Sequence, residues 1–356
     1  MVTVGGMTGL SRIAGFLRDI LTAMFLGAGP VADAFFVALK LPNFFRRITA
    51  EGAFTVSFVP VYTDVREKEG EEKAAAFAGH SFAIMFFGLS LFVIAGLYGM
   101  PWIIKFIAPG FKENGERYAL AIQLASLTFP YLLLISLTAL LGGVLNAHEK
   151  FAPFAFAPVL FNLTLIVMLF LSDTLFQSAG HAMAWGVFLS GFLQLGLLAV
   201  VVEKSKIKIS PVRPVIDPHV KKLFKLIGPG LIGAGVMQIN LFVDLILASL
   251  LETGSISYLY YADRLNQLPL GIVGIAIGTA LLPMMSKALA AERSDEAKKL
   301  FNEALQICMI LALPASTALI IIGQPIIVTL FEHGEFSLYA AKQTANVLFA
   351  YALGMP

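Results

Sequence analysis

Charged side chains are scarce in this chain. Only 13% of its 356 residues are Asp, Glu, Lys or Arg, whereas 58% are hydrophobic, and the mean hydropathy is +0.82. Soluble domains carry about 25% charged residues. A chain this poor in charge cannot cover its surface in water, so a soluble enzyme is excluded. The composition predicts an all-α polytopic membrane protein.

Cysteine content and net charge are low as well. The single cysteine, Cys308, excludes a disulfide framework and a multi-cysteine metal site. A formal net charge of +2 gives no reason to expect a nucleic-acid partner. The sequence also lacks a Ser/His/Asp grouping, a phosphate-binding loop and an acidic metal motif, so we expect neither an enzyme nor a bound cofactor.

Long apolar segments fill most of the chain. A helix needs about 20 mainly apolar residues to cross a bilayer, and about ten segments meet this criterion. The second is interrupted by Pro42 and by Arg46 and Arg47, and the eighth by Pro269. The predicted spans are 3–27, 31–63, 74–106, 118–146, 152–171, 180–202, 223–251, 256–286, 299–322 and 337–356.

Lysine and arginine are unevenly distributed among the predicted loops. The loops after even-numbered spans are basic, whereas those after odd-numbered spans carry only Lys105, Lys112 and Arg117. This asymmetry places the even loops and the N-terminus in the cytoplasm. We interpret the basic stretch 204–222 as a linker between an N-terminal lobe, 1–203, and a C-terminal lobe, 223–356. An ordinary cytoplasmic loop fits this stretch equally well.

The two lobes resemble each other in sequence. Matched residues recur at a nearly constant spacing over five predicted spans, which indicates an internal duplication. The matches include Gly99 with Gly323, Pro101 with Pro325, Phe77 with Phe301, Gly110 with Gly334, Asp19 with Asp244, and Gly29 with Gly254. Six spans per lobe make the repeats parallel, as in transporters whose substrate site lies between the lobes. The second lobe stops in its fourth helix, so we expect a truncated lobe and a longer parent protein.

Ionisable residues inside the spans are the main functional signal, because each one at a helix centre costs roughly 2.5–3.5 kcal/mol. Arg12, Arg18 and Arg264 are candidates for binding a diphosphate, whose oxygens a guanidinium can hold bidentately. On an ideal helix, Arg12 and Arg18 lie about 120° apart, so both can border one broad cavity.

Structural ion pairs are the alternative interpretation of these charges. The spacing allows Arg18 to pair with Asp19 or Asp33, and Arg264 to pair with Asp263. From the spacing alone, the two interpretations are equally well supported.

Several motifs are distinctive enough to indicate a family. They are SRIAGFLRD at 11–19, GAG at 27–29, ADAFF at 32–36, KLPNFFRR at 40–47, AEGAF at 50–54, FVP at 58–60, YYADRL at 260–265 and LP at 282–283. In these motifs the sequence resembles the MurJ (MviN) family of bacterial lipid II flippases, and the resemblance covers essentially the whole chain.

The resemblance implies a two-lobed transporter, similar to multidrug and oligosaccharidyl-lipid/polysaccharide exporters. Such a protein carries lipid II, the undecaprenyl-diphosphate-linked peptidoglycan precursor, to the periplasmic leaflet of the inner membrane by alternating access. The family's functional arginines correspond to Arg12, Arg18, Arg46 and Arg264. The resemblance also implies membrane lipids and cell-wall synthesis or division proteins as partners.

Acidic residues are expected to form gating contacts or to pair with the arginines. By resemblance, Asp33 forms gating pairs near the periplasmic side, and we assign Asp19, Glu51 and Asp263 to gating or charge pairing. The resemblance further implies a sodium site at Asp244 for ion coupling, since carboxylate oxygen suits a hard cation. The match of Asp244 with Asp19 in the repeat favours a purely structural role instead.

Two other functions stay open. One is export of a different polyprenyl-diphosphate-linked saccharide, and the other is a non-transporting membrane scaffold for cell-wall synthesis. A scaffold predicts that neutralising Arg18 and Arg264 leaves function intact. An intramembrane transferase would need paired acids to bind magnesium, and the sequence contains no such pair.

Overall fold

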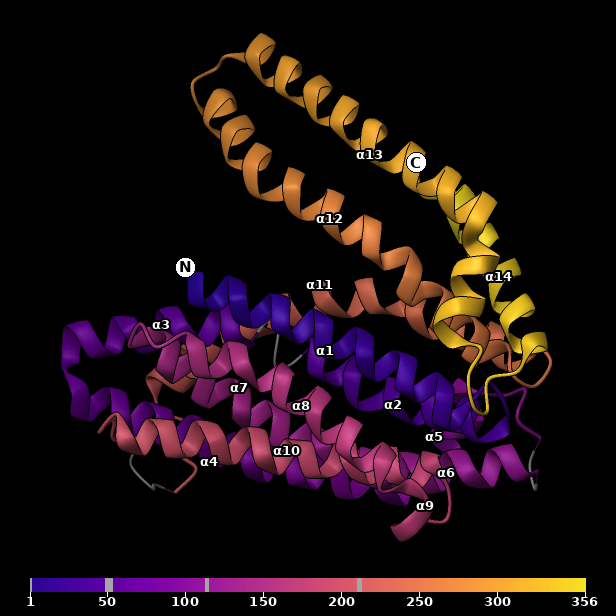
Figure 1. Ribbon diagram of the computed structural model, residues 1–356. Helices are drawn as coiled ribbons and strands as arrows, with labels where there is room; N and C mark the ends of the chain where they lie inside the picture. Colours follow the sequence, from indigo (N-terminus) through magenta and orange to yellow (C-terminus); the bar gives the residue numbers. More distant parts are fainter. Residues whose placement is uncertain (1, 49–53, 113–114, 210–212) are drawn as a thin grey trace. The chain divides into compact units, whose positions relative to one another are not determined.

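The computed structural model describes residues 2–48, 54–112, 115–209 and 213–356, and within these ranges the regular structure is entirely helical (Figure 1). The helices are α1 (Val2–Leu26), α2 (Pro30–Ile48), α3 (Phe54–Glu69), α4 (Glu71–Tyr98), α5 (Met100–Ile107), α6 (Glu116–Thr128), α7 (Tyr131–Ala147), α8 (Ala152–Phe170), α9 (Ser172–Leu175), α10 (Ala179–Lys204), α11 (Pro218–Ser249), α12 (Ser255–Ala290), α13 (Ser294–Phe331) and α14 (Leu338–Leu353).

Five helical segments are long and apolar enough to cross a membrane, so the chain is a multi-pass membrane protein. They are Glu71–Tyr98, Glu116–Ala147, Ala152–Phe170, Ala179–Lys204 and Ser294–Phe331. Each predicted span overlaps one described helix or two consecutive ones. The count of ten spans stays a prediction, because the other helices do not meet the same length and hydropathy criterion over the described residues.

The proline interruptions differ from the prediction. Helix α12 continues through Pro269 and Pro283, and α2 continues through Pro42 to Ile48. The predicted break of the eighth span at Pro269 is therefore wrong. A proline removes one N–H from the helix, but in a membrane the neighbouring backbone adjusts locally, because a full break would expose more unpaired polar groups.

The chain divides into two compact units, of which the first comprises Met1–Thr22 and Gly29–Thr253. Its interior is formed by α2, α6, α7, α8 and α10, which pack against one another. The most apolar 18-residue window of Glu116–Ala147 is 78% buried, whereas that of Glu71–Tyr98 is only 17% buried. The α6–α7 segment is thus the central element of this unit, and α4 lies at its surface.

Stacked aromatic rings join α3 to α4. Phe54, Phe58 and Tyr62 follow one another at four-residue spacing on α3, with ring centroids 5.2 and 5.7 Å apart. Phe77 of α4 stacks on Phe58 at 5.4 Å. All four rings are buried, so this column fixes the first turns of α4 against α3.

The second unit comprises Ala23–Ala28 and Gly254–Pro356 and contains α12, α13 and α14. Tyr261 lies at its centre, where its ring contacts Phe331 and Phe336 and its hydroxyl donates to the Gly27 carbonyl at 3.1 Å. Ser316 of α13 donates to the Ala352 carbonyl of α14 at 2.7 Å. These contacts tie the C-terminal helices together.

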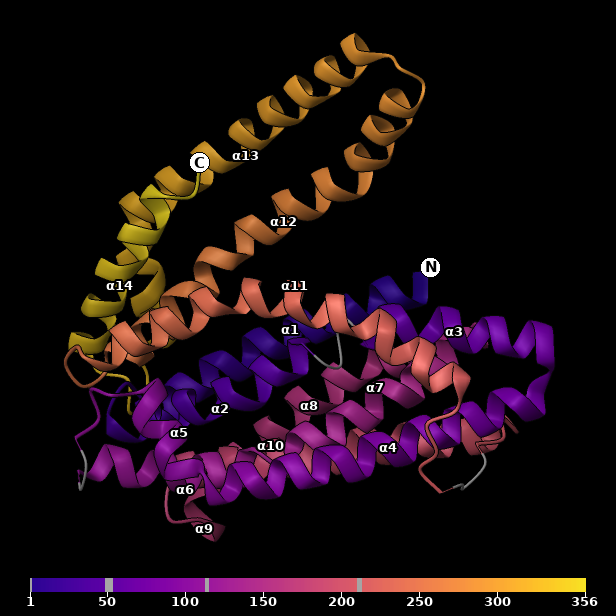
Figure 2. The same ribbon diagram turned by 180° about the vertical axis from the view of Figure 1, so that it is seen from behind.

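Glycines that the predicted repeat matches lie at similar distances from helix ends. Gly29 directly precedes α2 and Gly254 directly precedes α12, while Gly110 and Gly334 each lie three residues after a helix, α5 and α13 respectively. The two compact units nevertheless divide the chain elsewhere than the lobes 1–203 and 223–356, because α11 packs on α2, α3, α4 and α5 (Figure 2). The lobe boundaries and the linker 204–222 stay predictions.

Candidate functional site

Arg18 of α1 lies in a buried polar cluster with Asp19 and Asn162. Its Nη2 and Nε atoms donate to Asp19 Oδ1 at 2.6 and 3.2 Å, and its Nη1 atom donates to Asn162 Oδ1 at 2.9 Å. The side chains of Arg18 and Asp19 are 11% and 4% exposed. Asn162, from α8, also donates through Nδ2 to the Ser11 carbonyl at 3.1 Å. We name Arg18, Asp19 and Asn162 the Arg18 cluster.

The chemistry of the Arg18 cluster follows from burial. A guanidinium stays charged in proteins, so a buried arginine needs a counterion, and Asp19 supplies it. The Phe161 ring lies 5.9 Å from the guanidinium carbon and covers it further. The cluster therefore holds a permanent cation inside the fold, and an anion that replaces Asn162 or Asp19 as the acceptor would meet oriented donors.

Asp33 pairs with Arg117, an arginine that the sequence interpretation did not consider as its partner. Its side chain is fully buried in the first turn of α2, and its Oδ2 atom lies 3.6 Å from Arg117 Nη1 in the first turn of α6. The guanidinium carbon of Arg117 lies 4.7 Å above the Phe111 ring. The pair Asp33–Arg117 thus anchors the loop between α5 and α6 on α2.

The remaining charged candidates of the first two spans lie at more accessible positions. Arg12 and Arg47 are exposed, and Arg46 is half-buried with Nε donating to Asn43 Oδ1 at 3.4 Å. Arg12 thus does not enter the Arg18 cluster, although both residues belong to α1. Glu51 lies outside the described residues.

Asp263 and Arg264 belong to the second unit, in the third turn of α12. The Arg264 guanidinium carbon lies 4.8 Å above the Tyr260 ring, and Gln267 Nε2 donates to Asp263 Oδ2. Both acid and arginine are half-buried. Stacking on an aromatic face leaves the edge of a guanidinium available for hydrogen bonds, which suits binding of phosphate. The predicted convergence of Arg264 with Arg12 and Arg18 stays a prediction.

Asp244, the candidate sodium ligand, lies at an exposed position of α11. Over the described ranges, no group of three or more His, Cys, Asp or Glu residues is arranged to hold a metal ion. Sodium is also bound by backbone and hydroxyl oxygens, so ion coupling through Asp244 stays a prediction.

Ion pairs join the end of α3 to the start of α11. Asp64 binds Lys222 at 3.0 Å and Lys68 one turn along its own helix, while Glu69 lies 3.2 Å from His219 Nε2. Hydrogen bonds from Lys68 and then Lys222 lower the pKa of Asp64 to about 2. This cluster is exposed, so salt screens its contribution.

In two loops, a glycine lies in close contact with the end of a helix from another part of the chain. Gly110 donates through its backbone N–H to Ser249 Oγ at 3.1 Å, and a Cβ at Gly110 would overlap the Ser249 carbonyl. In the second unit, a Cβ at Gly334 would overlap the Met24 carbonyl, and Glu335 N–H donates to that carbonyl at 2.9 Å. Each loop is therefore fitted to the last turns of a helix that is distant in the sequence.

The structure adds Asn162 and Arg117 to the residues that sequence reasoning selected. Asn162 is the most polar side chain of the apolar span 152–171, which was the available signal. Arg117 was counted only as a loop charge for orientation. Of the predicted pairs, Arg18 with Asp19 is present, whereas Asp33 forms an ion pair with Arg117.

The all-helical fold, with charges held inside it, is a fold found in membrane transporters, multidrug exporters among them. An inward-facing multidrug transporter of the MATE family shares the fold, with a TM-score of 0.76 at 15% identity, over 99% of this chain and 82% of that chain. A solved lipid II flippase MurJ, in an inward closed conformation, has a TM-score of 0.81 at 30% identity, over 100% of this chain and 73% of that one.

Sequence comparison specifies the family. The family model described as lipid II flippase MurJ matches residues 22–356. The probable lipid II flippase MurJ of Rhizobium meliloti (strain 1021) is 41% identical over 99% of this chain and 67% of its own length. The lipid II flippase MurJ of Burkholderia cenocepacia is 33% identical over 100% of this chain and 70% of its own length. The chain belongs to the lipid II flippase MurJ family, a family of transporters rather than catalysts.

Proposed function

We propose that this chain flips lipid II from the cytoplasmic to the periplasmic leaflet of the bacterial inner membrane. The family match over residues 22–356, with relatives up to 41% identical, carries this proposal. The charge distribution of the loops supports a cytoplasmic N-terminus. No bond of the substrate changes, so the work done is a conformational step that moves a charged headgroup across the bilayer.

The diphosphate of the substrate is the group that we expect arginine side chains to bind. In our proposal Arg18 and Arg264 bind it, because a guanidinium forms two parallel hydrogen bonds to phosphate oxygens. Arg18 supports this role by keeping its charge at a buried position, with Asp19 as counterion until the diphosphate arrives. Arg12 and Arg46, which are more accessible, meet the headgroup first on the cytoplasmic side.

Alternating access requires contacts that form in one state and break in the other. We assign Asp33 with Arg117 and the glycine contacts at Gly110 and Gly334 to the periplasmic side, since all of them lie in or beside loops after odd-numbered spans. The membrane potential, or a sodium gradient acting through Asp244, would drive the cycle. Cell-wall synthesis and division proteins would use the delivered precursor.

The test is lipid II accessibility in flippase-depleted cells that express the native protein or a variant. The readout is the fraction of lipid II cleaved by a degrading enzyme added from outside. We expect the native protein to restore cleavage and Arg18→Ala and Arg264→Ala to abolish it at equal membrane levels. Arg293→Ala is the matched control, because Arg293 is exposed and forms an ion pair with nearby Glu296, which is exposed as well. No restoration by the native protein would contradict the proposal.

A further inference from the structure

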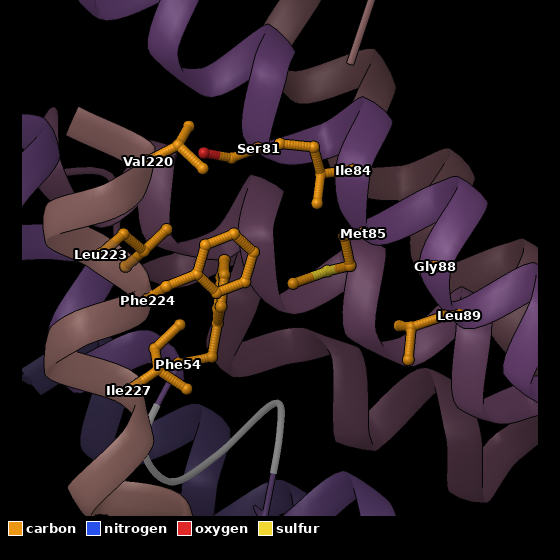
Figure 3. Close-up of a pocket in the computed structure, with 10 residues that line it drawn as sticks. All are labelled: Phe54, Ser81, Ile84, Met85, Gly88, Leu89, Val220, Leu223, Phe224 and Ile227. Carbon is orange, nitrogen blue, oxygen red and sulfur yellow. The ribbon is translucent and has the colours of Figure 1, made fainter. Parts of the chain in front are cut away.

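An apolar pocket opens between α4 and α11, away from the Arg18 cluster. Its volume is about 310 Å³, and its lining comes from α4, from the first turns of α11 and from Phe54 of α3. Figure 3 shows Phe54, Phe224 and Ile227 on one side and Met85 and Leu89 on the other. The lining is apolar apart from one hydroxyl.

That hydroxyl belongs to Ser81. The side chain is 4% exposed, and its Oγ atom has no hydrogen-bond partner in the described part of the chain. A buried hydroxyl without a partner costs free energy, so a native structure keeps one only for a reason. In Figure 3 the Ser81 oxygen points across the gap between α4 and α11, toward Val220. A ligand with an acceptor oxygen would satisfy it there.

The position of the pocket along α4 indicates where such a ligand would lie. The first turn of α4 is charged, with Glu71 and Glu72. Ser81 follows about 15 Å further along the helix, and Leu89 about 12 Å beyond Ser81. Among the apolar spans of its unit α4 is the least buried, which suits a lipid-facing helix. The pocket has its one hydroxyl nearer the charged start of α4 and its purely apolar end further along the helix, the order in which a phospholipid carries its ester groups and its acyl chains.

Two lysines lie on the same turns of α11. Lys221 and Lys225 are exposed and four residues apart, so they share one side of the helix, with Lys221 three residues from Phe224. Lysines at this level extend their ammonium groups toward headgroups, and basic pockets between helices on the cytoplasmic side bind anionic lipids. An uncharged lipid would use the apolar lining equally well but would gain nothing from these two lysines.

We propose that the pocket between α4 and α11 binds one acyl chain of an anionic diacyl phospholipid. Ser81 donates its hydroxyl hydrogen to an ester carbonyl of this lipid, and Lys221 and Lys225 attract its phosphate. The site goes beyond the proposed transport of lipid II, because it takes a lipid of the surrounding bilayer. Bound there, the lipid fastens the first turns of α11 to α4.

Substitution of Gly88, which lines the pocket, can fill it with a side chain. A Cβ at Gly88 would meet no atom within 4 Å, so Gly88→Phe occupies open space without a clash at its Cβ. Gly196 of α10 is also an exposed helical glycine with no atom within 4 Å of an added Cβ, and it lies outside the pocket, so Gly196→Phe is the matched control. Both variants carry the same helix-propensity change.

The experiment is native mass spectrometry of the delipidated protein titrated with dioleoyl phosphatidylglycerol or dioleoyl phosphatidylcholine. We expect Gly88→Phe to weaken binding of one phosphatidylglycerol about tenfold, the factor for losing two buried methylene groups, while Gly196→Phe binds as the native protein does. Ser81→Ala should weaken binding of both lipids about fivefold, as expected for one lost hydrogen bond. Lys221→Gln with Lys225→Gln should remove the preference for phosphatidylglycerol.

Equal binding by native protein, Gly88→Phe and Ser81→Ala would overturn the proposal, as would equal losses in Gly88→Phe and Gly196→Phe. A short polyprenyl diphosphate, added in a parallel titration, tests the substrate's own tail as the occupant. If Gly88→Phe weakens binding of that probe but not of phosphatidylglycerol, the phospholipid assignment is wrong. Should Gly88→Phe fail to fold, Ser81→Ala and the lysine pair still decide the outcome. None of these results depends on lipid II flipping.

Discussion

Helix α11 is attached at its two ends by different chemistry. At its last turn, Ser249 meets the backbone of Gly110, where no side chain fits. At its first turns, Lys222 forms an ion pair with Asp64 at 3.0 Å, and His219 Nε2 lies 3.2 Å from a carboxylate oxygen of Glu69. The first attachment depends on shape and the second on charge.

The difference indicates which end of α11 releases more readily. Exposed ion pairs contribute little to stability and weaken in salt, over a screening distance of about 8 Å at physiological ionic strength. A close backbone contact is insensitive to salt, and the loop that makes it is also anchored by the buried pair of Asp33 with Arg117. We therefore expect the ends of α11 that carry Lys222 and Ser249 to respond differently to mutation, salt and pH.

The largest effect is expected from breaking the buried pair. Arg117→Met keeps an apolar stem on Phe111 but removes the charge 3.6 Å from the fully buried Asp33. Losing one member of a buried pair costs roughly 3 kcal/mol in the free energy of unfolding. Chemical unfolding in detergent measures this cost, and the double variant Arg117→Met with Asp33→Asn should recover part of it. Strictly additive losses would contradict a direct pair.

A smaller loss is expected from filling the glycine contact. Gly110→Val would force the loop or the end of α11 to move, because its Cβ overlaps the Ser249 carbonyl. Overpacking of this kind costs roughly 2 kcal/mol. Gly29→Val is the matched control, since a Cβ at Gly29 meets no atom within 4 Å. Equal thermal unfolding of the two variants would argue that the contact at Gly110 is not tight.

The smallest effect is expected at the ion-paired end. The pKa of Asp64, lowered to about 2 by Lys68 and Lys222, lies below its value in the unfolded chain, about 3.9. Its stabilising contribution is therefore complete above pH 4 and is lost as the pH falls toward 2. Hydrogen exchange should show earlier opening of the first turns of α11 at pH 3 or in 1 M salt, and Lys222→Ala should reduce this dependence, because only the contact of His219 with Glu69 then remains. Equal changes at Ser249 would remove the contrast between the two ends.

Much of the fold is readable from the sequence, because span boundaries follow from local signals. Gly29 and Gly254, which the predicted repeat matches, directly precede α2 and α12, close to the predicted span starts at 31 and 256. The break expected at Pro269 was wrong, since a proline's effect depends on whether neighbouring backbone can adjust, which the sequence does not specify. The count of ten spans and the lobe boundaries stay predictions.

The candidate site was readable only in part. The pairing of Arg18 with Asp19 could be proposed because the two residues are adjacent in the chain. The hydrogen bond from Arg18 to Asn162 joins residues 144 positions apart, and the pairing of Asp33 with Arg117 depends on how the loop after α5 folds back. Such contacts follow from helix packing, for which a single sequence contains no direct signal.

The central claim is that Arg18 binds the substrate's diphosphate although Asp19 holds it in this state. Binding of a short polyprenyl diphosphate to the purified protein tests it most directly, with native protein, Arg18→Lys and Asp19→Asn compared. We predict that Arg18→Lys binds about tenfold more weakly, because it loses the guanidinium fork, and that Asp19→Asn binds at least as tightly as the native protein, because a competing carboxylate is gone. Equal weakening in both variants would contradict the account and would make the pair purely structural.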